Sequence, residues 1–248
     1  MIFARTLAFK LLRVRQLCRL EIKYIGGTML HPNTELRFVN EEIGYGVFAT
    51  AAIPKGTIVY VKDCLEIEIT EDRFHNMDIA CKNIVEKYSY IDERGVRIVS
   101  WDHAKYVNHR CDCNSMSTGY GFEIAIRNIE EGEEITDEYG LFNIPSPIEV
   151  NCGCAACRRT LLPTDIDRFY RDWDIKIQEA FRCLKEVPQP LLHLMDNESV
   201  SDLLNYLSGK SRYRSVRKLK YRRSKRGYRA KASRSQSIEN INVECSPA

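Results

Sequence analysis

The sequence contains no apolar run of about 18 residues, the length that a helix needs to cross a bilayer. It also has no internal repeat and no Cys-x2-Cys pair within a βαβ pattern, which a thioredoxin-like redox site would need. Gly44-Tyr45-Gly46 lies between two predicted strands, whereas a dinucleotide fingerprint is followed by a helix. These absences argue against a membrane span, a repeat scaffold and dinucleotide-dependent chemistry.

Acidic residues are scarce at both ends of the chain. Residues 1–27 hold six Lys/Arg and one Glu, and residues 210–234 hold thirteen Lys/Arg and no acid. Residues 28–209 therefore contain 18 basic and 31 acidic residues, a net charge of −13. An acidic body attracts basic ligands through its long-range field. Solubility alone explains the same charge equally well.

The basic ends allow several interpretations. Residues 1–24 resemble an amphipathic transit peptide, but an ordinary basic surface helix or a leader before a start at Met29 fits as well. From Gly209 onward the lack of an apolar period predicts a disordered tail over 209–248. Arginine and tyrosine alternate within 210–234 as they do in nucleic-acid binders, and a localisation signal is the alternative.

The central part of the chain reads as short strands separated by glycine and proline. Strands are expected on both sides of Gly44–Gly46, after the turn at 54–56, and within 95–102 and 121–129. The segment 71–87 is the best interior candidate for a short helix.

A helical pattern begins after Cys157. Apolar residues recur at steps of three and four from Ile166 to Leu184, with Thr164 or Asp165 placed to cap the first turn. Ser199–Leu207 is expected to form a second short helix. We interpret the aromatic residues of this pattern as packing residues.

The chain has ten cysteines, and five of them fall in two short segments. Cys152, Cys154 and Cys157 provide three thiolates of a tetrahedral zinc site, which needs a fourth ligand. The obvious donors are Cys111 and Cys113, with His109 behind them. Free thiols or a catalytic cysteine are the alternatives.

Four motifs occur in one order: "GYGVFATAAIPKGT", "YVNHRCDCN", "GEEITDEYG" and "CGCAACR". This order, over roughly residues 34–158, resembles the SET-domain protein lysine methyltransferases with a post-SET zinc segment. The resemblance implies an α+β, mostly β fold of small pseudoknotted sheets, in which 106–115 packs against 133–140. The cysteine spacing looks most like the branch that modifies histone H4.

The resemblance also implies a domain order. It consists of a basic N-terminal extension (1–27), a SET domain (28–145), a post-SET zinc segment (146–160), a helical extension (161–208) and a basic tail (209–248).

The resemblance assigns roles to individual residues. S-adenosylmethionine would lie along Gly44, Tyr45 and Gly46, with Asn108 and His109 at its adenine and amino-acid ends, and Tyr139 would be both catalytic and in contact with the cofactor. Zinc would be held by Cys111, Cys152, Cys154 and Cys157. Several tyrosines are available for the walls of the lysine channel, and Tyr106 is favoured because it adjoins Asn108; the others are Tyr60, Tyr88, Tyr90 and Tyr120.

Some positions depart from the family pattern. Arg110 and Cys113 stand where Ser or Asp and Pro are usual, and Leu65-Glu66 replaces a Gly-Glu pair. Glu138 replaces the Asp before the catalytic tyrosine. Asp137 stands where an aromatic residue often helps to set the number of methyl groups added, so the product state is open.

The expected function is S-adenosylmethionine-dependent methylation of lysine in a histone or another basic protein, by an intracellular monomer in the nucleus or on chromatin. Two alternatives stay open: an inactive SET-like module that binds basic partners, and a zinc-containing nucleic-acid binder. The sequence does not identify the substrate protein or its lysine.

Overall fold

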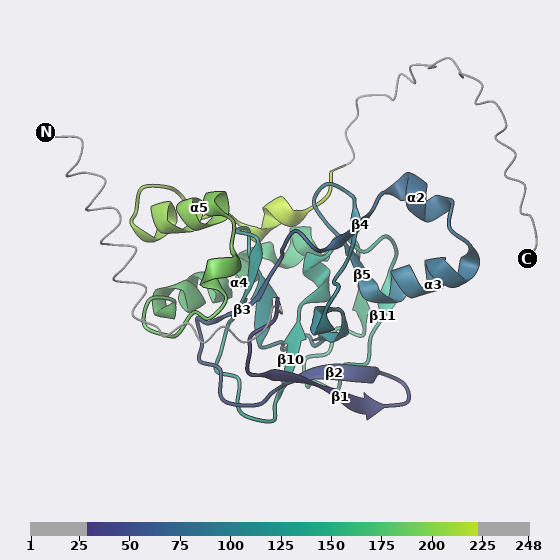
Figure 1. The fold of residues 1–248 in the computed structure, drawn as a ribbon, viewed down its shortest axis with the longest axis horizontal. Helices are drawn as coiled ribbons and strands as arrows, with labels where there is room; N and C mark the ends of the chain where they lie inside the picture. Colours follow the sequence, from purple (N-terminus) through teal and green to yellow (C-terminus); the bar gives the residue numbers. More distant parts are fainter. Residues whose placement is uncertain (1–28, 223–248) are drawn as a thin grey trace, which may run out of the picture.

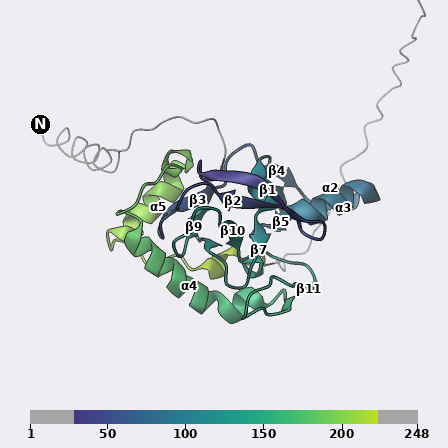
Figure 2. The ribbon, with the colours of Figure 1, turned by 90° about the horizontal axis from the view of Figure 1, so that it is seen from below.

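The computed structural model describes residues 29–222 (Figure 1). The basic extension over 1–27, its targeting interpretation and the distal part of the tail lie outside these residues. Small sheets lie between two groups of helices, which the views of Figures 1 and 2 both separate. The helices α2 (Glu71–His75) and α3 (Ile79–Tyr88) are on one side, and α4 (Asp165–Cys183) and α5 (Asn197–Leu207) are on the other.

The four-stranded sheet brings distant segments together in the order β1-β2-β10-β7. Its strands are β1 (Thr34–Asn40), β2 (Gly44–Ala49), β7 (Asn108–His109) and β10 (Glu134–Asp137). Strand β10 is antiparallel to β2 and parallel to β7. The Asn114 side chain joins the two predicted neighbours, because its Nδ2 donates to the Glu134 carbonyl (2.8 Å) and its Oδ1 accepts from the Thr136 amide (2.9 Å). The expected packing of 106–115 against 133–140 is confirmed.

Three smaller sheets complete the β structure. Their orders are β3-β9-β8, β4-β6-β5 and β11-β12. The strands are β3 (Ile58–Val61), β4 (Ile67–Ile69), β5 (Ser89–Ile91), β6 (Arg97–Val99), β8 (Ser115–Ser117), β9 (Phe122–Ala125), β11 (Ile148–Glu149) and β12 (Thr160–Leu161). Short 3-10 turns also occur: η1 (His103–Tyr106), η2 (Tyr139–Leu141), η3 (Leu192–Leu194) and η4 (Val216–Leu219). The term "mostly β" therefore suits the part of the chain before α4.

The single helix expected over 71–87 is two helices. The first helix ends at its C-cap residue Asn76, and Asp78 caps the second, since its side chain accepts a hydrogen bond from the Cys81 amide (2.8 Å). A carboxylate at this position satisfies a free N–H group of the first turn, so a new helix begins there.

Helix α4 has the amphipathic packing that its sequence predicts. Its buried face includes Trp173, Ile177 and Phe181, each exposed by 4% or less. These side chains cover the β3-β9-β8 sheet in one core cluster with Ile124 and Met116. Thr164 is the N-cap residue but makes no side-chain capping bond, so the expected cap is absent. The aromatic residues are packing residues, as predicted.

Residues 209–222 contradict the prediction of a tail disordered from Gly209. Val216 is fully buried against α4, and its amide donates to Asp174 Oδ1 (2.9 Å). The Arg214 amide donates to the Tyr120 hydroxyl (2.9 Å). The segment has too few apolar residues for a visible period, but Tyr213, Val216 and Leu219 pack in the core beside α4.

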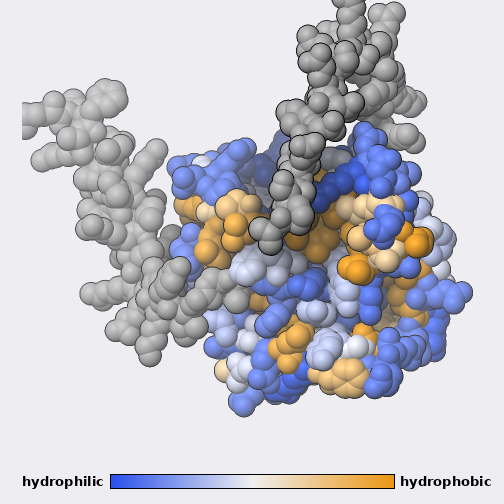
Figure 3. Space-filling view, turned by 45° about the vertical axis from the view of Figure 1, so that its right-hand side comes forward, coloured by the Kyte–Doolittle hydropathy of each residue, from blue (hydrophilic) through white to orange (hydrophobic). Residues whose placement is uncertain are grey.

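Apolar side chains are exposed on residues 62–99, the segment that contains α2 and α3 and that we call the insertion. Leu65, Ile79 and Ile84 have 60% or more of their surface exposed. The face turned forward in Figure 3 shows separate apolar patches within a hydrophilic surface. Within residues 29–222, no helix combines the length and the apolar character that a membrane crossing requires.

Candidate functional site

Tyr139 is the first residue of η2 and is separated from the end of β10 by Glu138. Its hydroxyl donates to the Val107 carbonyl (2.7 Å), and its amide lies 3.2 Å from His109 Nδ1. Burial, followed by the nearby carboxyl groups of Asp137 and Glu123, raises the pKa of the Tyr139 phenol above its usual value. The hydroxyl therefore stays protonated and is fixed in position by the neighbouring strand.

Asn108 and Gly46 meet beside this tyrosine. Asn108 Nδ2 donates to the Tyr45 carbonyl (3.1 Å) and to Glu134 Oε1 (2.7 Å). A Cβ atom at Gly46 would lie 2.3 Å from Glu134 Oε1 and 3.1 Å from Asn108 Nδ2, so a larger residue would displace the Glu134 carboxylate. Gly44 has a φ of 85°, which also favours glycine. The predicted residues 44–46, Asn108 and Tyr139 are thus brought together by the β2-β10-β7 pairing.

A cavity of about 330 Å³ lies on the side of Tyr139 that faces the insertion. Aromatic residues form much of its wall: Tyr60, Tyr88, Tyr90, Tyr139 and Phe142. Tyr106, the residue favoured for a channel, is not among the lining residues. Its ring instead packs edge-on against Tyr45 (5.9 Å between centroids) and Tyr88 (5.4 Å).

Two carboxyl groups meet in the wall of this cavity. Ser117 Oγ lies 3.1 Å from Glu123 Oε1 and 3.4 Å from Asp137 Oδ2, so one hydroxyl bridges both side chains. Burial and the neighbouring carboxylate raise the pKa of Asp137, and burial raises that of Glu123 to about 7. Two buried carboxyls in contact cannot both ionise readily, so the pair retains one proton near neutral pH.

Glu138 points away from this pair toward α4. It forms an ion pair with Arg158, and its Oε1 accepts a hydrogen bond from the Gly140 amide (2.8 Å). Burial raises the pKa of Glu138 more than Arg158 lowers it. Arg158 Nη1 also lies 3.9 Å from Asp165 Oδ2 on α4. Glu138 and Arg158 therefore fix η2, and with it Tyr139, against the C-terminal helix.

The cysteine segment is enclosed by the β11-β12 hairpin and approaches Cys111. Cys152 Sγ lies 3.4 Å from Cys154 Sγ. Ligand atoms of His109, Cys111 and Cys152 all lie within 4.8 Å of one another. Burial raises the pKa of Cys152, but bonds from the Cys111 and Cys154 backbone and from the Cys154 and Cys157 thiols lower it to about 6. The cluster thus contains a thiol that ionises easily.

The remaining members of the cluster are less closely grouped. Cys157 Sγ donates to the Val150 carbonyl at 3.6 Å, and Cys111 Sγ accepts from the Arg158 amide at 3.4 Å. Cys113 is 97% buried in the core beside α4. Of the two candidate donors from the 106–115 segment, Cys111 is therefore the one at the cluster.

His109 belongs to both the cysteine cluster and the tyrosine site. Its Nε2 lies 3.2 Å from Cys111 Sγ, while Nδ1 faces the Asp137 carbonyl at 3.1 Å. Burial, followed by the Arg158 charge, lowers the pKa of His109 to about 4. The ring is therefore neutral at physiological pH and connects the two halves of the site.

Comparisons with known proteins agree with this arrangement. Residues 44–140 match the family model of the SET domain. The span runs from the first glycine of β2 to the residue after Tyr139 and so includes the predicted cofactor and tyrosine positions.

Two relatives carry names that describe an activity. The histone-lysine N-methyltransferase mes-4 of Caenorhabditis elegans is 27% identical over 48% of this chain and 16% of its own length. A candidate histone-lysine N-methyltransferase of Arabidopsis thaliana, ASHH4, is 24% identical over 49% of this chain and 37% of its own. The chain thus spans well under half of either relative.

One solved structure is similar over part of its length. It is KRYPTONITE in complex with mCHG DNA and SAH, with 22% identity, a TM-score of 0.38, and coverage of 53% of this chain and 29% of that chain.

Three residues of the site had no clear signal in the sequence. Glu123 and Arg97 line the cavity from strands β9 and β6, and Arg158 directly follows Cys157. Glu123 and Arg97 are charged residues within otherwise apolar strand patterns. This interruption of the pattern is the signal that could have identified them. Arg158 is one of two consecutive arginines, and only the fold distinguishes it from Arg159.

Proposed function

We propose that this protein transfers a methyl group from S-adenosylmethionine to the side-chain amine of a lysine in a basic protein, with histones as the first candidates. The observation that carries the proposal is the Tyr139 hydroxyl, fixed on Val107 between the glycine strand with Asn108 and an aromatic cavity. The SET match and the names of the relatives support it. The same names favour a nuclear or chromatin location, and the acidic body favours a basic substrate.

The residues around Gly46 fit such a cofactor. Gly44 has open space where a side chain would stand, and Asn108 offers a half-buried amide next to the Glu134 carboxylate. Donors and a carboxylate side by side suit a ligand that carries both an amine and a carboxylate. Bound there, S-adenosylmethionine would supply an electrophilic methyl group. We assign Gly44, Tyr45, Gly46, Asn108 and His109 to its binding.

The protein's own contribution would be to prepare the amine. Lysine has a reference pKa near 10.4, so at pH 7 only about one side chain in a few thousand is neutral. The aromatic wall of the cavity around Tyr139 disfavours an ammonium ion. The Tyr139 hydroxyl, bonded to Val107, orients the nitrogen by fixed geometry.

We further assign a structural zinc ion to Cys111, Cys152, Cys154 and Cys157. A cluster of thiols with one of lowered pKa has the chemistry that zinc prefers, and four thiolates close a tetrahedral site with Zn–S distances of about 2.3 Å. Zinc would fix the β11-β12 hairpin beside Tyr139. Metal analysis of the purified protein tests this: one zinc per chain is expected in the unaltered protein, and Cys152→Ser should lose it. Zinc retained in full by Cys152→Ser would refute the assignment.

The alternatives have less support. Three of the seven basic residues between 210 and 222 are paired, since Arg214 contacts Asp202 and both Arg217 and Lys220 contact Asp167. This lowers the charge that residues 210–222 offer to nucleic acid. An inactive module is the expectation if Glu138 displaced Tyr139, but Glu138 has its own partner in Arg158.

The experiment is a radiolabelled methyl-transfer assay of the full chain against mixed histones and total cell protein. Transfer to a protein band, lost on Tyr139→Phe, is expected. Asn108→Ala should weaken cofactor binding in calorimetry as well as turnover, because it removes a polar group from the cofactor strand. Cofactor binding without any transfer would favour the inactive module.

A further inference from the structure

The guanidinium of Arg97 has no acceptor. The residue is 7% exposed, and its side chain forms no hydrogen bond or ion pair with any residue between 29 and 222. Its Nε is buried without a partner, and its Cζ lies 4.0 Å from the centre of the Phe74 ring. A buried charge without a counter-charge is costly, so such an arginine is usually completed by another group.

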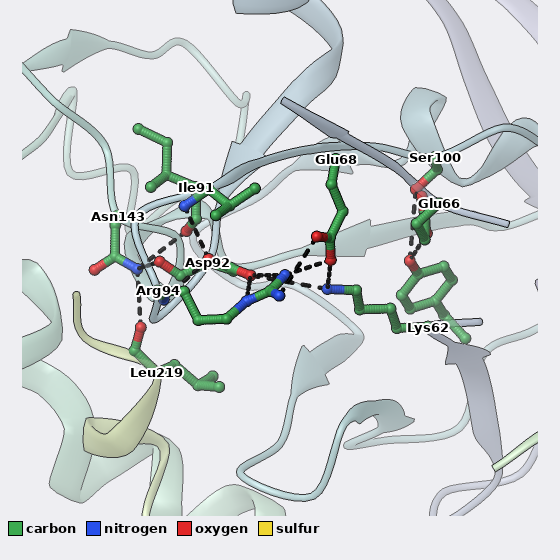
Figure 4. A network of polar contacts seen from close by, with 11 residues as sticks. Lys62, Glu66, Glu68, Ile91, Asp92, Arg94, Ser100, Asn143 and Leu219 are labelled. Atoms are coloured by element: carbon green, nitrogen blue, oxygen red, sulfur yellow. Dashed lines mark hydrogen bonds and ion pairs between the residues drawn. The ribbon is translucent and has the colours of Figure 1, made fainter. Parts of the chain in front are cut away.

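Two acids of the β4-β6-β5 sheet region, Glu68 on β4 and Asp92 after β5, already have basic partners. Arg94 is paired with Glu68 and with Asp92, and Lys62 approaches both carboxylates at 3.7 and 3.8 Å (Figure 4). Arg94 and Arg97 therefore differ sharply: the first has two carboxylate partners and the second has none.

A second donor without a partner lies near Arg97. Ser89 Oγ is buried and makes no hydrogen bond in the described chain. In the β5-β6 pairing Arg97 stands opposite Ile91, and Ser89 is two residues along the same strand. The two side chains therefore share one face of the sheet as diagonal neighbours, with Cβ atoms about 7–8 Å apart.

Both residues line the cavity that contains Tyr139. Its wall thus carries a positive group on β6 and a hydroxyl on β5, while Glu123 and Asp137 lie on other strands of the same cavity. A ligand that satisfies all of them needs a cation at one place and an anion at another.

We propose that Arg97 and Ser89 form a subsite for an acidic side chain of the protein substrate, an Asp or Glu close in sequence to the lysine. The proposal rests on the proposed lysine methylation. A guanidinium presents a planar pair of donors that matches a carboxylate, and a hydroxyl can supply a further bond. The subsite selects, among lysines of a basic protein, those with an acidic neighbour.

The test measures binding to the full chain and does not depend on turnover. The probes are fluorescent lysine peptides that are identical except for a single Glu or Gln, placed in turn at each position on both sides of the lysine. We expect one Glu position to bind about 10-fold more tightly than its Gln counterpart, the usual gain from a charge-assisted pair. Inorganic phosphate is added as a competitor, to distinguish a peptide carboxylate from any small anion.

Three variants make the result specific. Arg97→Gln should abolish the Glu preference, and Ser89→Ala should reduce it while removing only a hydroxyl. Arg94→Gln is the matched control, because it removes the same charge from the same hairpin but from an arginine that is already paired. It should retain the full preference. Thermal unfolding of each variant verifies folding, and Ser89→Ala keeps the test valid if Arg97→Gln is unstable.

The outcomes separate this proposal from the proposed function. No Glu preference at any position, or a preference that Arg97→Gln and Ser89→Ala leave intact, overturns the subsite, even if histone methylation is observed. Displacement by phosphate without a Glu preference also overturns it, since the site then binds any anion. A Glu preference lost in Arg97→Gln supports the subsite, and if no methyl transfer is found in the separate assay, only the enzymatic function fails.

Discussion

Asp137 and Glu138 are adjacent acids whose side chains lie in opposite surroundings. Asp137 faces the cavity and meets a second carboxyl group, Glu123, whereas Glu138 faces α4 and meets the cation of Arg158. Each is 1% exposed. A buried carboxyl group therefore has a paired charge on the helix side and a shared proton on the cavity side. We infer that the helix side supports the fold and that the cavity side serves ligand chemistry.

The largest effect is expected from Arg158→Ala, which would leave Glu138 buried without its partner. Loss of one member of a buried ion pair costs about 3–5 kcal/mol. Denaturant unfolding of the purified chain should therefore show a large loss of stability. The double variant Arg158→Leu with Glu138→Gln should recover most of it, because no unpaired charge remains. If Arg158→Ala is as stable as the original protein, solvent reaches Glu138. The contrast between the helix side and the cavity side then fails.

On the cavity side, Tyr139→Phe should leave stability nearly unchanged and reduce methyl transfer. The change removes one hydroxyl and its bond to Val107 but almost no volume. Positioning groups of this kind contribute a factor of about 10² in rate. Calorimetric cofactor affinity should stay the same. Full activity in this variant would refute the mechanism, whatever the substrate.

Asp137→Asn should increase stability at pH 7, because burial and the neighbouring carboxyl group raise the pKa of Asp137 and so disfavour its ionised form in the folded protein. The carboxyls of Asp137 and Glu123 have raised pKa values, so the folded state binds protons more tightly than the unfolded state. Their contribution to the free energy of unfolding is therefore complete below about pH 4, the pKa of these groups in the unfolded chain. It is lost as pH rises toward about 7. The variant should lose less stability over this interval.

Other groups titrate in the same range and must be compared between the two proteins. His31 and His109 have pKa values lowered to about 4 by burial, so their contribution has the opposite sign and grows as pH rises. Glu66 and Glu138 have raised pKa values and act in the same direction as the pair. All four are retained in Asp137→Asn. Parallel pH curves for the two proteins would show that Asp137 and Glu123 do not share a proton.

The sequence predicted the helix side well and the cavity side less well. The apolar residues that recur at steps of three and four from Ile166 to Leu184 predict a helix with one buried face, and α4 is that helix. Neighbours in space are not visible in this way: Glu123 and Arg97 share a cavity with Tyr139 only because strands of three different sheets meet there. The motifs located Asn108, Tyr139 and Cys111, because each is a short pattern read along the chain.

The tail shows a second limit of sequence reading. Composition predicts disorder from Gly209, yet Gly119 lies so close to the Arg214 backbone that a Cβ there would be 2.5 Å from its carbonyl oxygen. The contacts of 209–222 are made by a few residues with distant partners, such as Val216 with Asp174. Average composition does not report such isolated contacts.

Tyr106 gives the smallest expected effect and decides between the sequence-based channel and the observed cavity. As a channel residue, Tyr106 would lose a wall hydroxyl in Tyr106→Phe, and turnover or the number of methyl groups added should change. In the structure its ring lies between Tyr45 and Tyr88, outside the lining of the cavity, and its hydroxyl forms no hydrogen bond with residues 29–222. The phenyl ring keeps both ring contacts, so we expect turnover within about twofold of the original, because a hydroxyl without a partner adds little. Mass spectrometry of the methylated peptide gives both rate and product state. A changed ratio of mono- to dimethylated product would place Tyr106 in the channel after all and would assign the cavity to another part of the substrate.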